Sequence, residues 1–133
     1  MKLVPHLQVI GAPRAIDWYK QVFDAREIAR YVDKRQDKIV HADLVIGESP
    51  ISIREGDAKY GVITLHVDDA FAVGERMTAA GAKVIYPIAD QFYGDRQGRL
   101  EDPFGQQWVV TQRLREMSPE EIQQGVDDWK PDA

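Results

Sequence analysis

An approximate internal repeat, with a spacing of 57 residues in a chain of 133, is the feature that most constrains the fold. At this spacing residues 23–28 align with residues 80–85, and residues 51–53 align with residues 108–110. A repeat of this length indicates one supersecondary unit that occurs twice, with neighbouring copies burying a common core. The chain is also short enough to form a single domain. The repeat therefore predicts one small domain built from two similar modules.

Apolar spacing predicts two amphipathic helices, over residues 12–23 and 69–80. Pro13 suits the first turn of the earlier helix, and Gly81 is a typical stop signal for the later one. A third helix is predicted over residues 119–128, since Ser118 can cap it and acidic residues follow. Period-two alternation predicts strands over 39–46, 50–54, 62–67 and 108–114, with weaker candidates at 3–9, 27–32 and 83–86. Each repeat then reads as a strand, a helix and three strands.

Composition excludes several classes of function. The formal net charge of −5 argues against a nucleic-acid partner or a membrane surface. The chain has no cysteine, which excludes disulfides, thiolate zinc sites and cysteine nucleophiles. No apolar stretch approaches the roughly 20 residues of a membrane span, and the N-terminal segment does not resemble a signal peptide. We therefore expect a cytoplasmic protein.

Several local sequences carry a family resemblance. They are AIDWYKQVF at 15–23, HADLVIG at 41–47, YGDR at 93–96, DPFG at 102–105 with Trp108, and SPEE at 118–121. Together with the repeat they resemble the vicinal oxygen chelate superfamily of glyoxalases, extradiol dioxygenases and bleomycin-resistance proteins. These local sequences are most similar to those of its PhnB-like branch. A fold of this kind serves many reactions, so the resemblance alone selects none of them.

The resemblance implies an α+β fold, with two βαβββ modules forming a cup-shaped mixed sheet and a short C-terminal helix after them. It implies a single domain over residues 1–115, with pseudo-repeats at about 3–55 and 60–114. Residues 116–133 would form the C-terminal helix and an acidic tail. Family members usually dimerise, often completing the pocket at the subunit boundary. The resemblance therefore implies a homodimer.

Enzymes of the superfamily hold a divalent metal with His or Glu side chains from the first and last strands of both modules. Carried over through the resemblance, these positions fall on Val4, Ser52, Val62 and Val109. None of them offers the carboxylate oxygen or imidazole nitrogen that such a metal needs. An alignment shifted by one residue gives Pro5, Ile53, Ile63 and Val110, or Leu3, Ile51, Gly61 and Trp108. We therefore expect no family metal and no cofactor.

A second departure from the branch follows the DPFG segment. The resemblance leads one to expect a histidine there, and this chain has Gln106. Glutamine can donate and accept hydrogen bonds but cannot titrate. A proton-transfer role of that histidine in relatives would thus be lost here.

Strand alternation divides the predicted sheet into a helix-packed face and a cup-lining face. On one strand Val40, Ala42, Leu44 and Ile46 are predicted to pack against a helix. The cup face is predicted to hold His6, Gln8, His41, Asp43, Ser52, Arg54, Val62, Thr64, His66, Gln107, Val109 and Thr111. All three histidines of the chain belong to this set.

Three interpretations of these histidines stay open. His6, His41 and His66 could form a non-standard metal site, with Asp43 as a fourth ligand or an orienting group. They could instead be separate side chains that line a polar pocket. His41 with Asp43 could also act as a general base, because a carboxylate stabilises the charged imidazole.

The segment 90–98 is rich in aromatic and hydrogen-bonding groups. Phe92 and Tyr93 could stack on a flat ligand, and Arg96 could pair with an anionic group. The alternative is a turn centred on Gly94 and held by Asp95 and Arg96, with the ring of Tyr93 packed against the protein. Aromatic residues elsewhere have simpler expectations: Trp18 and Trp108 belong to the core. Trp129 would dock on the body of the protein or on a partner subunit.

The function predicted from these observations is binding of a small organic molecule, an antibiotic or a metabolite, without a metal. Its ligand-binding residues would be His6, Gln8, His41, Arg54, Thr64, His66, Phe92, Tyr93, Arg96 and Gln107. One alternative is a metal-dependent lyase, isomerase or dioxygenase with a non-standard histidine site. Another is a metal-free enzyme in which His41 with Asp43, or else His66, abstracts a proton next to a carbonyl.

Overall fold

Residues 4–57 and 61–129 are described by a computed structural model. The first module consists of β1 (His6–Val9), α1 (Ala12–Phe23), β2 (Arg26–Asp33), β3 (Lys38–Ile46) and β4 (Ser49–Glu55). The second repeats this order with β5 (Val62–His66), α2 (Ala70–Ala79), β6 (Lys83–Asp90), β7 (Asp95–Glu101) and β8 (Gln107–Arg113). A last helix, α3 (Pro119–Asp128), follows. The predicted pair of βαβββ modules and the α+β fold are confirmed.

Each module forms its own four-stranded mixed sheet. The strand order is β1-β4-β3-β2 in the first sheet and β5-β8-β7-β6 in the second. The first and last strands of each module, β1 with β4 and β5 with β8, pair in parallel, and the other neighbours are antiparallel. The eight strands of the expected cup are therefore divided equally between two sheets of the same topology.

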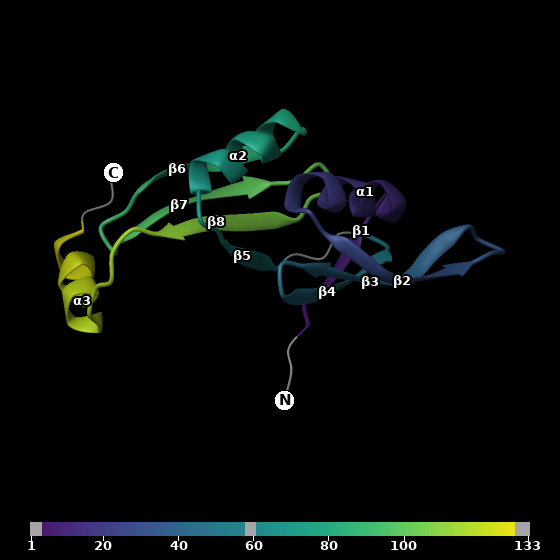
Figure 1. The fold of residues 1–133 in the computed structure, drawn as a ribbon, viewed down its shortest axis with the longest axis horizontal. Helices are drawn as coiled ribbons and strands as arrows, with labels where there is room; N and C mark the ends of the chain where they lie inside the picture. The colour runs from purple at the N-terminus through teal and green to yellow at the C-terminus, as the bar shows by residue number, and fades with distance from the viewer. Residues whose placement is uncertain (1–3, 58–60, 130–133) are drawn as a thin grey trace.

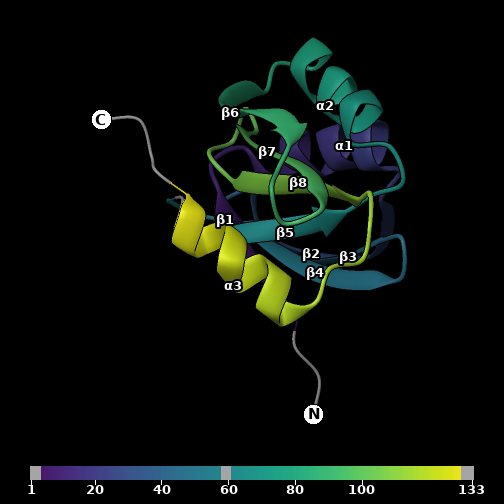
Figure 2. The same ribbon diagram turned by 90° about the vertical axis from the view of Figure 1, so that its left-hand side faces the viewer.

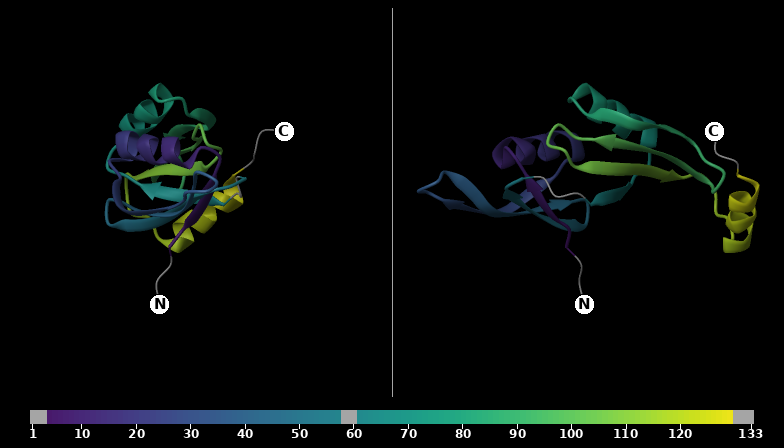
Figure 3. Two further views of the ribbon diagram at one scale, coloured as in Figure 1. Left: turned by 90° about the vertical axis from the view of Figure 1, so that its right-hand side faces the viewer. Right: turned by 180° about the vertical axis from the view of Figure 1, so that it is seen from behind.

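Both module helices lie on the same side of the two sheets (Figure 1). The view from the end shows α1 and α2 above the strands (Figure 2), and α3 stands at one end of the elongated molecule. The β2–β3 hairpin forms the opposite end, as the view from behind also shows (Figure 3). We call the side of each sheet that faces away from α1 and α2 its open face. Within the described residues no helix is long and apolar enough to span a bilayer.

Aromatic side chains of α1 join the two modules into one core. Trp18 donates a hydrogen bond from its indole nitrogen to the carbonyl of Ala80, at 2.7 Å. Tyr19 donates one from its hydroxyl to Asp102, at 2.6 Å, across 83 residues of sequence. Trp108 is 1% exposed and lies edge-on to Phe23, with 4.8 Å between ring centroids. The predicted core positions of Trp18 and Trp108 are confirmed, whereas Trp129 is 59% exposed and does not dock on the body of the protein.

Hydrogen bonds from side chains fix the N-terminal ends of α1 and α3. The carboxylate of Glu55 accepts hydrogen bonds from the backbone amides of Gly11 and Ala12, which satisfies donors at the start of α1. Ser118 and Glu121 form the reciprocal capping box at the start of α3. The sequence 118–121 therefore sets the beginning of α3, as predicted.

The strand β7 has no counterpart in the sequence-based assignment, which treats residues 90–98 as a connection. Its sequence DRQGRLE lacks a run of β-branched residues, so its alternation is hidden. Only Gly98 and Leu100 are buried, and the polar residues that alternate with them, Gln97, Arg99 and Glu101, face the other way. The connection proper is the short segment 91–94, closed by a hydrogen bond from the amide of Gln91 to the carbonyl of Asp95.

The packing predicted for Val40 is also wrong. Val40 is 48% exposed, and its neighbour Ile39 is 4% exposed instead. Tyr31 pairs with His41 and Val32 with Ile39, so Val40 is left over as a bulge in the β2–β3 ladder. A bulge shifts the alternation by one residue, and Ala42 and Leu44 beyond it keep their predicted burial.

Candidate functional site

A row of polar side chains crosses the open face of the first sheet. His6 on β1 pairs in register with Ser52 on β4, which pairs with Asp43 on β3. The Ser52 hydroxyl donates to the Asp43 carboxylate at 3.1 Å, and His41 Nε2 lies 2.8 Å from the same oxygen. Residues opposite one another in a ladder share a face, so strand pairing alone gathers these groups.

The environment of Asp43 favours its charged form. The hydrogen bond with His41 is the main reason that the pKa of Asp43 lies below its usual range, and the bond from Ser52 adds to the effect. When neutral His41 donates from Nε2 to this carboxylate, Nδ1 keeps its lone pair and can accept a proton. The His41 side chain is 40% exposed. The pair therefore has the geometry of an oriented base.

Only two of the three histidines come near one another. The rings of His6 and His41 are 6.0 Å apart. His66 lies on β5 in the second sheet, exposed on its open face. Across residues 4–57 and 61–129, no three His, Asp or Glu side chains meet in a cluster able to hold a metal ion.

Of the four positions that the resemblance assigns to a metal, Val4 precedes β1 and the other three lie on the two sheets, and their side chains do not fit a metal. Ser52 belongs to the first sheet, while Val62 and Val109 lie on the second, on adjacent strands. Two hydrocarbon side chains offer no ligand, and the Ser52 hydroxyl is already bonded to Asp43. We derive no step through a metal at these positions.

The open face of the second sheet carries a row of four side chains, of which the sequence predicted only the two on β5 and β8. In register across β5, β8, β7 and β6 lie Thr64, Val109, Arg99 and Tyr86. The guanidinium carbon of Arg99 lies 5.6 Å from the centre of the Tyr86 ring. Arg99 could have been found only by recognising β7 as a strand, because its outward position follows from the alternation around Gly98 and Leu100.

The aromatic residues of the β6–β7 connection, Phe92 and Tyr93, and the neighbouring Arg96 of β7 make contacts within the protein itself. Phe92 packs against α3, since a Cβ added to Gly125 would lie 2.5 Å from its ring. The Tyr93 hydroxyl accepts a hydrogen bond from Gln97 at 2.9 Å. Arg96 forms an ion pair with Asp90 at 2.7 Å. Their predicted role in ligand binding stays a prediction, and the contacts give each of them a structural role.

The remaining predicted residues lie along the same two open faces. Gln8 pairs in register with Arg54 on the first sheet, and its amide donates to the backbone of Asp57. Gln107 lies on the second sheet, with its carbonyl oxygen 3.4 Å from an Arg99 nitrogen. The neighbouring Gln106 is buried and donates to the carbonyl of Gly61 at 2.7 Å. The side chain that replaces the expected histidine therefore ties β5 to β8.

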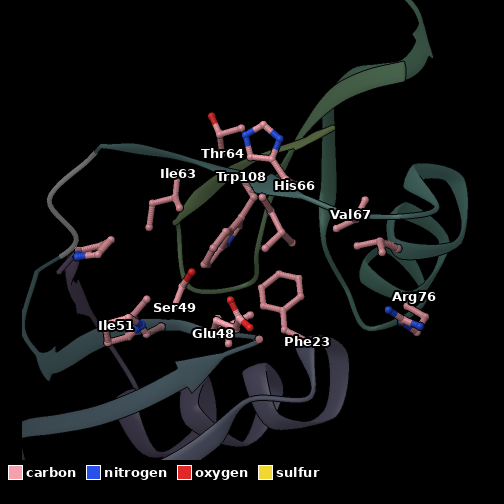
Figure 4. Close-up of a pocket in the computed structure, with 16 residues that line it drawn as sticks. Phe23, Glu48, Ser49, Ile51, Ile63, Thr64, His66, Val67, Arg76 and Trp108 are labelled. Atoms are coloured by element: carbon pink, nitrogen blue, oxygen red, sulfur yellow. The ribbon is translucent and has the colours of Figure 1, made fainter. Parts of the chain in front are cut away.

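A cavity of about 700 Å³ lies between the β3–β4 turn and β5. Its walls are mostly apolar core side chains, among them Phe23, Ile63 and Trp108. Thr64 and His66, two predicted ligand-binding residues, are among the residues that line it. In Figure 4 the side chain of Ile63 points into this space, and the side chains of Thr64 and His66 lie on the far side of β5. The cavity is large enough for a small organic molecule, and it is separated from the open face by a single strand.

Comparisons with known proteins agree with this architecture. The family model described as the Glyoxalase/Bleomycin resistance protein/Dioxygenase superfamily matches residues 4–110. The uncharacterized protein Mb0911c of Mycobacterium bovis is 35% identical, over 91% of this chain and 89% of its own length. The crystal structure of TioX from Micromonospora sp. ML1 has a TM-score of 0.71 at 28% identity, covering 86% of this chain and 99% of its own.

A PhnB protein from Bacillus cereus shares the fold, with a TM-score of 0.67 at 16% identity over 84% of this chain and 99% of its own. The match to the family model extends across both modules, from before β1 into β8. The similarity therefore involves the whole repeated architecture and both open faces. The chain belongs to the Glyoxalase/Bleomycin resistance protein/Dioxygenase superfamily.

Proposed function

We propose that this protein binds a small organic molecule against the open faces of its sheets, without a metal. The observation that carries the proposal is the chemistry of these faces: valine and serine stand at positions that the resemblance assigns to a metal, while hydrogen-bonding side chains surround them. His6, His41 and Asp43 supply such groups on the first sheet, and Thr64 and Arg99 supply them on the second. Sites for small organic molecules combine a few polar groups of this kind with apolar surface.

Exposed aromatic rings add apolar surface to the same faces. Tyr31 is 58% exposed next to His41, and Tyr86 is 61% exposed next to Arg99. Rings of this size can stack on a flat ligand at little cost in conformational entropy. The family name includes a bleomycin resistance protein, which supports an antibiotic or a metabolite as the class of ligand.

We further propose that the protein is a homodimer acting in the cytoplasm. Two open faces with exposed Tyr31, Val62 and Tyr86 would gain from being covered by a second copy. Light scattering at micromolar concentration should then give twice the chain mass of 15.1 kDa. A monomeric mass would count against the dimer and leave the binding proposal untouched.

The binding proposal is tested by NMR with ¹⁵N-labelled protein in the presence of EDTA. A panel of small planar acids, amides and amines is titrated, and perturbed amides are mapped on the structure. We expect the shifts to concentrate on β3, β4, β7 and β8 residues of the open faces. Shifts confined to the indole of Trp108 would place the ligand in the cavity instead. Binding that requires added zinc or manganese would refute metal independence.

The His41–Asp43 contact favours one second candidate, a metal-free enzyme that abstracts a proton next to a carbonyl. An oriented imidazole within hydrogen-bond distance of a carboxylate is a typical general base. The test is exchange of the methyl protons of pyruvate in D₂O, followed by NMR. Catalysed exchange that His41→Ala abolishes and His66→Ala preserves would support this candidate. No catalysed exchange in the unmodified protein would remove it.

A further inference from the structure

Two buried polar atoms stand without a hydrogen-bond partner among residues 4–57 and 61–129: Arg99 Nε and Thr111 Oγ1. Thr111 as a whole is only 2% exposed. Folded proteins pair the great majority of their buried polar groups, so each exception calls for an explanation. The two atoms belong to adjacent strands, β7 and β8, which makes a common explanation reasonable.

Strand register places both side chains on the open face of the second sheet. Arg99 pairs with Val109, and Gln97 pairs with Thr111, so Arg99 and Thr111 are diagonal neighbours. Diagonal neighbours in an antiparallel pair are within reach of a long side chain. The residues that alternate with them, including Gly98 and Leu100, are buried on the side of α2. Arg99 and Thr111 therefore lie on the side of the sheet that faces away from α1 and α2, with Arg99 Nε and Thr111 Oγ1 buried beneath that face.

Arg99 also differs from the other arginines of its sheet in its electrostatics. Arg96 is paired with Asp90 at 2.7 Å, and Arg113 with Asp95 at 2.6 Å. Arg99 has no carboxylate within 4.0 Å in the described part of the chain, and its single polar contact is the long one to Gln107. Glu101, which follows on the same face, is not in contact with it. A half-buried guanidinium without a counter-ion is a strong attractor for an oxyanion.

We propose that Arg99 and Thr111 together bind an oxyanion group of the ligand, a carboxylate or a phosphonate. The inference rests on the proposed binding function and narrows its ligand to an acid. Nε–H and a terminal N–H of Arg99 meet two oxygens along one edge, and the Thr111 hydroxyl donates a further hydrogen bond. The ring of Tyr86, beside the guanidinium, is available for the flat part of the ligand.

The test compares three probes of similar shape: benzoate, phenylphosphonate and the neutral benzamide. Each is titrated into ¹⁵N-arginine-labelled protein, and the Nε–H signal of Arg99 reports contact directly. We expect the two acids to shift this signal and to bind at least ten-fold more tightly than benzamide, whichever of the two is preferred. Arg99→Gln should weaken the preferred acid by roughly 10- to 100-fold, as loss of a charge-assisted hydrogen bond implies, and leave benzamide unchanged. The matched control is Arg30→Gln on β2, which removes an arginine already paired with Glu27 at 2.6 Å and should change neither.

Thr111→Val supplies a second, independent measurement, because it removes the hydroxyl and keeps the shape. In the free protein this change should leave the unfolding temperature equal or higher, since the lost group has no partner. It should weaken the binding of benzoate about ten-fold, in keeping with the loss of one hydrogen bond to a charged group. A marked loss of stability in Thr111→Val would show that the hydroxyl is structural and would overturn its assigned role.

The failure of this inference can be separated from the failure of the proposed function. Equal binding of benzoate and benzamide, insensitive to Arg99→Gln, would overturn the oxyanion site and leave small-molecule binding intact. No response of either open face to any probe would overturn both. Dissociation of the dimer in Arg99→Gln would make Arg99 a contact between subunits, and that result would also overturn the proposal.

Discussion

Removing the hydroxyl of Tyr19, which links the two modules, should lower the free energy of unfolding by about 2 kcal/mol. This is the usual loss for one hydrogen bond to a charged acceptor. Asp102 is 3% exposed and accepts four hydrogen bonds, from Tyr19, Trp108 and the backbone amides of Phe104 and Gln106. Tyr19→Phe leaves the carboxylate with three donors and almost unchanged packing. For a chain of this size the loss corresponds to a fall in Tm of roughly 5–10 °C.

The same substitution should cost more at neutral pH than in acid. Burial raises the pKa of Asp102, while its hydrogen bonds oppose the rise. The folded state therefore holds this proton more tightly than the unfolded chain, and stability falls as the pH rises from the unfolded to the folded pKa. Tyr19→Phe removes one of the hydrogen bonds that lower the pKa of Asp102, so this pKa rises further in the folded state. The pH range over which stability falls then extends to higher pH.

The assay is urea unfolding at pH 4 and pH 8, at one fixed protein concentration, because the proposed dimer would contribute to stability. Tyr31→Phe serves as the control, since Tyr31 is 58% exposed and its hydroxyl has no hydrogen-bond partner in the described chain. The control should stay within about 0.5 kcal/mol of the unmodified protein. A loss in Tyr19→Phe no larger than that of the control, or one that is equal at the two pH values, would refute the reasoning.

Three further results are expected. Gly98→Ala should destabilise the protein by about 2 kcal/mol, because the added Cβ would lie 2.6 Å from the backbone nitrogen of Ile88; an unchanged Tm would contradict this close approach. His41→Ala should raise the pKa of Asp43 toward its usual range, because the main hydrogen bond that lowers it is removed. The stability that depends on the low pKa is then lost at a higher pH as acid is added. NMR titration of the Asp43 carboxyl measures this pKa, and an unaltered value would exclude the contact. Ser118→Ala should lose about 1 kcal/mol of local stability in α3, seen as faster amide exchange in that helix alone.

Most of the fold is readable from the sequence because its signals are local. Pro119 at the first position and the capping box give the start of α3 directly. The alternation of Ile63 and Leu65 with exposed neighbours gives β5 and its faces. By contrast, β7 was missed because a strand with only Gly98 and Leu100 buried carries little apolar pattern. This strand forms because it pairs with β6 and β8 on either side, and a short stretch of sequence does not contain that information.

The candidate site is predictable to the level of a sheet face and no further. Alternation correctly placed His41 and Asp43 on the open face, and their contact at 2.8 Å follows from their spacing. The distance of His66 from them depends on how two separate sheets are arranged. Arg99 escaped notice for a different reason: whether a guanidinium lacks a counter-ion depends on three-dimensional neighbours, and the chain has several arginines of similar sequence context.

The separation of helix-packed and open faces has a consequence for the evolution of such a protein. Along β3 beyond its bulge, and along β5, side chains packed into the core alternate with side chains of the open face. Positions such as Thr64, Arg99 and Tyr86 can therefore be replaced together without altering the buried aromatic cluster of α1 and β8. One architecture can in this way acquire new ligands by mutation at little risk to folding, as a superfamily named for both resistance proteins and dioxygenases illustrates.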